Sequence, residues 1–160
     1  MNNKRQFYVS FKSADTLIER FKLSLPTVHS HSSREMIVTH GLAHVATIQL
    51  HNPFVMDTDA SRSRVITSAR TIVANIAQVP LNKFGYIDPI MGTLLMAACQ
   101  VFVTELKRLR HRPINSPVPP EERLAMDATE TVLAAMNIFA PSCQLMNSQL
   151  IAMQQLYRGD

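Results

Sequence analysis

The stretch from residue 34 to residue 51 constrains the fold of this 160-residue chain more than any other. Its pattern predicts one continuous helix that ends before Pro53, because the residue that precedes a proline is pushed out of the α region. Apolar side chains cover most of its circumference, and such a helix is buried on several sides. They are Met36, Ile37, Val38, Leu42, Ala43, Val45, Ala46, Ile48 and Leu50. We therefore expect a fold in which other helices surround this one.

A narrow polar stripe interrupts the apolar surface of this helix: His40, His44, Thr47 and His51. At 3.6 residues per turn, these positions lie within roughly 60° of one another. His40 and His44 have the spacing at which two imidazoles can bind one metal ion, but Gly41 stands where an HExxH motif needs glutamate. We favour a hydrogen-bonded seam between helices, because buried imidazoles are normally satisfied by neighbours. A ligand-facing or partner-facing groove is the alternative, and no metal site is expected.

The rest of the sequence predicts further helices and no strand. Apolar periodicity and proline or glycine boundaries place them near residues 13–24, 60–78, 88–111, 120–139 and 141–157. Residues 1–12 are expected to form an extended lead-in, since Phe7, Val9 and Phe11 alternate with polar neighbours. Short connections favour antiparallel neighbours. The expected fold over residues 13–158 is all-α, an array of about six antiparallel-leaning helices and a fragment of a larger helical domain.

Composition restricts the class of protein. Apolar residues make up 46% of the chain and charged residues 18%, which suits a globular protein and excludes disorder. Cys99 and Cys143 have neither metal-ligand spacing nor the pattern of a disulfide framework, so we expect buried thiols in a reducing compartment. No membrane-spanning segment is expected, because the most apolar run, residues 90–103, has the length of a core helix.

The formal net charge of +4 is mild, and basic residues cluster only at residues 107–112. We favour the interpretation that these cations stabilise the negative end of a helix dipole. An acidic protein partner and a nucleic acid are the alternatives. No DNA-recognition motif is present, so this chain alone is not expected to bind DNA sequence-specifically.

The sequence predicts no enzyme. Its carboxylates stand at helix starts or on solvated faces, and no order of serine, histidine and aspartate matches a nucleophilic site. The nine methionines at helical spacing are more typical of a core than of a promiscuous binding surface. The expected activity is therefore binding.

Three stretches give the chain a resemblance to a known family. THGLAHVATIQLHNPF, residues 39–54, is similar to a segment of the regulatory (middle homology) region of fungal binuclear zinc-cluster transcription factors. ACQVFVTELKRLR, residues 98–110, resembles the following helix of that region. DTLIERFKLSLP, residues 15–26, resembles the helix that runs into a Leu-Pro break there. The resemblance spans approximately residues 13–157.

This resemblance implies the C-terminal part of an all-α regulatory domain that acts in the nucleus through ligands or through intramolecular or protein contacts. The family's zinc-binding cysteine cluster has no counterpart here, so zinc is expected only outside this chain. The expected partners are the remainder of the parent regulatory domain or other proteins. The first residues, MNNKRQFYVSF, lack a folded lead-in, so we expect a chain that begins inside a larger protein. The alternative is a freestanding helical interaction module with no regulatory ligand.

Overall fold

The fold is all-α, as predicted, in a computed structural model that describes residues 2–111 and 117–159. In these ranges the chain forms six α-helices, three single-turn 3-10 helices and no strand. The α-helices are α1 (Asn2–Ser24), α2 (Arg34–His51), α3 (Asp59–Gln78), α4 (Ile90–Arg110), α5 (Pro120–Phe139) and α6 (Gln144–Arg158). The 3-10 helices are η1 (Asn52–Phe54), η2 (Leu81–Lys83) and η3 (Ala140–Ser142).

Capping residues and prolines set the observed helix boundaries. Helix α2 has the predicted bounds, and the Ser33 side chain caps its start by accepting a hydrogen bond from the Met36 amide at 3.3 Å. Helix α4 is slightly shorter than the predicted 88–111 because Asp88 lies before it and caps the Ile90 amide at 2.9 Å. Helix α6 begins later than the predicted residue 141, since Pro141 belongs to η3.

The expectation of an extended segment over residues 1–12 is wrong, because α1 begins at Asn2. Phe7 and Phe11 lie one helical turn apart, and their ring centroids are separated by 6.4 Å. Both rings also pack against Phe54 of η1, at 6.2 Å and 5.3 Å. Phe7 and Phe11 therefore share one face of a helix and meet a distant part of the chain, whereas Val9 lies on the opposite side and is exposed.

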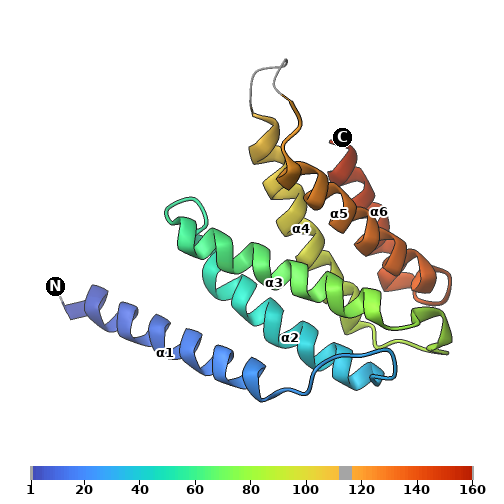
Figure 1. Ribbon diagram of the computed structural model, residues 1–160, viewed down its shortest axis with the longest axis horizontal. Helices are drawn as coiled ribbons and strands as arrows, with labels where there is room; N and C mark the ends of the chain where they lie inside the picture. Colours follow the sequence, from blue (N-terminus) through green and yellow to red (C-terminus); the bar gives the residue numbers. More distant parts are fainter. Residues whose placement is uncertain (1, 112–116, 160) are drawn as a thin grey trace.

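The helices form two antiparallel sets of three (Figure 1). Helices α1, α2 and α3 lie side by side in one set, and α4, α5 and α6 form the other. Helix α4 occupies the centre, since it packs against α2, α3, α5 and α6. Helix α2 contacts α1, α3 and α4, but its Leu42 is 49% exposed. The expectation that α2 is buried on several sides agrees with these contacts, and α4 is the helix with the most helix neighbours.

Helices α2 and α4 approach closely at Gly41. A β-carbon at this position would lie 2.8 Å from Cδ1 of Leu94, a side chain that is 2% exposed and has little room to move. A glycine is therefore needed here for close packing between the two helices.

Helix α4 is also long and apolar enough, by length and composition alone, to cross a membrane, with a mean hydropathy of 1.4 over its most apolar window. In the fold, 61% of that window is buried against other helices. The same property is found in core helices of soluble proteins, so it is weak evidence for a membrane segment.

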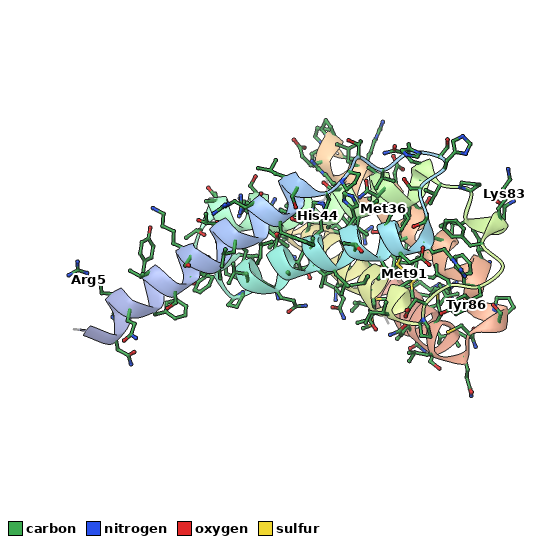
Figure 2. The ribbon with its side chains drawn as sticks, turned by 90° about the horizontal axis from the view of Figure 1, so that it is seen from below. Arg5, Met36, His44, Lys83, Tyr86 and Met91 are labelled. Carbon is green, nitrogen blue, oxygen red and sulfur yellow. The ribbon has the colours of Figure 1, made fainter. Side chains whose placement is uncertain are left out.

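Helix α1 carries the largest set of exposed apolar side chains found on any helix in the described ranges. Its N-terminal part, marked by Arg5, projects beyond the other helices (Figure 2). The exposed side chains are Phe7, Tyr8, Val9, Leu17, Phe21 and Leu23. These side chains are spread around the circumference of the projecting helix, and exposed apolar surface of this extent is typical of contact surfaces.

Candidate functional site

The polar stripe of α2 faces α1 and the connection between the two helices. The Nε2–H group of His40 donates a hydrogen bond to the Pro26 carbonyl at 2.8 Å, because a carbonyl can only accept. Thr47 is 1% exposed, and its hydroxyl oxygen accepts a hydrogen bond from the Lys22 ammonium at 3.1 Å. At His40 and Thr47, these contacts agree with the expected hydrogen-bonded seam between helices.

His51 joins three helices. Its Nδ1 atom lies 3.1 Å from the Ser61 hydroxyl of α3, and its Nε2 atom lies 3.1 Å from the Asp15 carboxylate of α1. This Asp–His–Ser order is that of a nucleophilic triad, although the two ring nitrogens have exchanged partners relative to a serine protease. Sequence reasoning missed the set, because its members lie on separate helices. Ser61 is only 7% exposed, and the three residues form a buried link between α1, α2 and α3.

Charged side chains extend this link along α1. The Arg64 guanidinium of α3 pairs with the carboxylates of Asp15 and Glu19, the latter at 2.9 Å, and Glu19 also pairs with Lys22. Burial raises the pKa of Asp15, but hydrogen bonds from His51 and Arg64 outweigh this effect and hold the pKa below its ordinary 3.8. The carboxylate is therefore stabilised in its charged form, and it ties α1 to α2 and α3.

His44 is the exception in the stripe. It lies half-buried between α1 and α2 (Figure 2), and its Nδ1 atom has no hydrogen-bond partner in the described chain. Burial, the charge of nearby Lys22 and that of His40 together lower the pKa of His44 from 6.5 to about 4. The ring is therefore held neutral, and it contributes a buried polar atom that the fold leaves unsatisfied.

The stripe does not assemble into a metal site. Over residues 2–111 and 117–159, no group of three or more histidine, cysteine, aspartate or glutamate side chains is placed to hold a metal ion. His51 does not add a third ligand to the i, i+4 pair His40 and His44, because its ring nitrogens lie beside Ser61 and Asp15.

Both cysteines are free. Cys99 is fully buried, as expected, and burial raises the pKa of its thiol to about 12, so the reactive thiolate is suppressed. Cys143 is only partly buried, so the expectation of a buried thiol is met in full only at Cys99.

A groove of about 680 Å³ lies between the C-terminal end of α2, the start of α3 and the second half of α4. Buried apolar side chains form its floor: Ile48, Val65, Ala97 and Val101. Exposed polar side chains, Gln49, Gln100 and Thr104, stand around them. Sequence reasoning missed this groove. The available signal was the presence of apolar Ala97 and Val101 beside polar Gln100 and Thr104 on one helix.

The mouth of the groove is basic. Arg62, Lys107 and Arg108 line it together with one carboxylate, Glu105. Arg108 pairs with Glu105 through two hydrogen bonds of 2.9 Å and 2.5 Å. The basic cluster near residues 107–112 therefore belongs in part to a concave surface. Arg112 lies outside the residues that the structure describes.

The stripe and the groove differ in what they offer to a ligand. Helices α1 and α3 occupy most of the stripe with their own side chains, whereas the groove has open volume, an apolar floor and a charged mouth. Such a combination is typical of small-molecule sites. No protein-family model matches the sequence, and searches among curated proteins and solved structures give no match either.

Proposed function

We propose that this chain is part of the all-α regulatory domain of a fungal zinc-cluster transcription factor and controls transcription by binding, without catalysis. Its groove binds an effector, and its exposed apolar surface contacts the remainder of the parent domain or another protein. The proposed compartment is the nucleus. Any zinc lies in a separate DNA-reading cluster outside this chain. The chain alone does not bind DNA sequence-specifically, and it does not insert into a membrane.

One observation carries the proposal. The segment with the most specific resemblance, residues 39–54, corresponds to most of α2 and all of η1. Its end supplies Ile48, Gln49 and Asn52 to the groove, and its polar stripe holds α1 in place. The stretch that resembles a regulatory region thus connects the groove to the helix that carries the exposed apolar surface. This arrangement supports a domain in which ligand binding and protein contacts influence each other.

A reporter assay tests the proposal. The complete chain is tethered to a heterologous DNA-binding domain in fungal cells, and expression from the matching promoter is measured. Gln100→Phe places a bulky ring in the groove from an exposed position on α4, and Ala74→Phe places the same ring on an exposed position of α3 outside the groove. We expect tethering to change reporter expression, Gln100→Phe to alter that effect, and Ala74→Phe to leave it unchanged.

Two results would contradict the proposal. One is reporter expression that does not respond to tethering of the unchanged chain. The other is a chromosomal reading frame in which no six-cysteine cluster is encoded with this chain. Either result would remove the basis for a role in a zinc-cluster factor.

The exposed apolar side chains of α1 favour a second candidate, a helical interaction module without a ligand. Six large apolar side chains on one helix point to a protein contact. This candidate predicts that Phe7→Ser together with Phe21→Ser abolishes association with a partner, while Gln100→Phe has no effect. Retained association in the doubly substituted chain would exclude α1 as the docking surface.

A further inference from the structure

We propose that the groove between α2, α3 and α4 binds an amphipathic monoanion, a molecule with an apolar body and one carboxylate. The inference rests on the proposed binding function and names the class of ligand that this site takes. The volume, the apolar floor and the distribution of charge at the mouth each contribute to it.

The size and the floor of the groove fit the apolar body of such a ligand. Its volume of about 680 Å³ falls within the range of roughly 300–1,000 Å³ that is usual for small-molecule sites. The floor comes from three helices, with Ile48 of α2, Val65 of α3 and Val101 of α4. Because these side chains belong to the buried core of the fold, the floor is preformed and needs little ordering on binding.

The charges at the mouth select an anion. Arg62 is paired with Asp59 at 2.6 Å, and Arg108 is paired with Glu105. Lys107 lines the same mouth, is exposed, and forms no ion pair with any residue that the structure describes. Among the described residues that line the mouth, its ammonium is therefore a cation that stays available to a ligand carboxylate.

The helix dipoles at the mouth offset each other. The last turn of α4 contributes the negative end of its dipole, and the first turn of α3, which carries Arg62, contributes a positive end. The preference for an anion therefore comes from the side chains, and in particular from Lys107. One unpaired cation among the described residues matches one carboxylate better than a polyanion, and the volume matches a small molecule better than a protein helix.

Direct binding to the purified chain tests the proposal. Dodecanoate, dodecanol and dodecylamine are titrated below their aggregation limits and followed by calorimetry. Because the three probes share an alkyl chain and differ in the head group, their comparison isolates the charge. We expect dodecanoate to bind about tenfold more tightly than dodecanol, because a partly desolvated charge pair adds to the apolar contact. Dodecylamine should bind most weakly.

Substitutions then assign the contacts. Lys107→Gln should reduce the affinity for dodecanoate to that for dodecanol and leave dodecanol binding unchanged. Lys83→Gln removes an exposed cation outside the groove and should affect neither probe. Gln100→Phe should weaken both probes by filling the groove, and Ala74→Phe should weaken neither.

Several outcomes would overturn the proposal: no binding, equal affinities for the three probes, or binding that Gln100→Phe leaves unchanged. A groove substitution that alters only self-association in light scattering would identify the groove as a protein interface and would also overturn it. If dodecanoate does not bind but the tethered chain still responds to Gln100→Phe, the ligand class is wrong and the regulatory function stands. If dodecanoate binds but the reporter does not respond, the ligand class stands and the transcriptional role is wrong.

Discussion

The unsatisfied ring of His44 predicts that the stability of the fold falls as the pH falls below neutrality. The pKa of His44 is about 4 in the folded chain, against an ordinary value of 6.5 that applies to the unfolded chain. Between these values the unfolded state binds more protons than the folded state, so protonation favours unfolding. The contribution of His44 to stability is therefore fully present above pH 6.5 and is lost as the pH falls toward 4.

Linkage gives the magnitude of this loss. A pKa of 6.5 in the unfolded state and about 4 in the folded state corresponds to a decrease of about 2 kcal/mol in unfolding free energy between pH 7 and pH 5. Asp15 also has a lowered pKa in the fold, but its stabilising effect is lost only as the pH falls below its ordinary 3.8, outside this window. The effect of His44 can thus be separated from that of the ion pairs beside it.

Urea denaturation at the two pH values measures the effect in the parent chain, in His44→Leu and in His31→Leu. We expect His44→Leu to lose about 2 kcal/mol less than the parent between pH 7 and pH 5. At pH 7 it should be at least as stable as the parent, because the substitution removes a buried polar atom without a partner. His31 is exposed in both states, so His31→Leu should retain the pH dependence of the parent. Equal losses in the parent and in His44→Leu would refute this reasoning.

Three further predictions follow from the packing and the charges. His51→Leu removes both side-chain hydrogen bonds of a buried ring and should lower the unfolding free energy by about 1–3 kcal/mol in urea titrations; a change below about 0.5 kcal/mol would contradict the interhelical link. Gly41→Ala should destabilise the fold by up to about 2 kcal/mol because its methyl group meets Leu94, whereas Gly85→Ala, with nothing within 4 Å, should be nearly neutral. In gel shifts the chain should show only weak, salt-dependent DNA binding, and discrimination against a point-mutated site at nanomolar concentration would contradict this.

Helix periodicity was sufficient to predict most of the architecture. The bounds of α2 and α5 agree with their predicted ranges, because serine or proline marks each start and a proline follows closely after each end. The first residues were misjudged, since the alternation of Phe7, Val9 and Phe11 suits a strand as well as a helix. In the helix, Phe7 and Phe11 both contact Phe54, which is distant in the sequence, and local periodicity could not predict this contact.

The candidate sites were harder to predict than the helices. The stripe could be identified from spacing on one helix, but its partners Asp15, Lys22 and Ser61 belong to other helices. The groove requires the relative placement of α2, α3 and α4, which local periodicity does not contain. For Ala97, Gln100 and Val101, the sequence indicates on which side of α4 each side chain lies. It does not indicate which other helices lie next to that side and form the groove.

We propose that the groove takes the ligand, whereas His40, Thr47 and His51 of the stripe hold neighbouring parts of the fold together. Nuclear magnetic resonance of the ¹⁵N-labelled chain during titration with dodecanoate tests it most directly. We predict that the amide signals of Val65, Val101 and Lys107 shift with ligand concentration, while those of His40 and His44 remain in place. Shifts that concentrate at His40 and His44 and spare the groove would contradict the claim and identify the stripe as the ligand site.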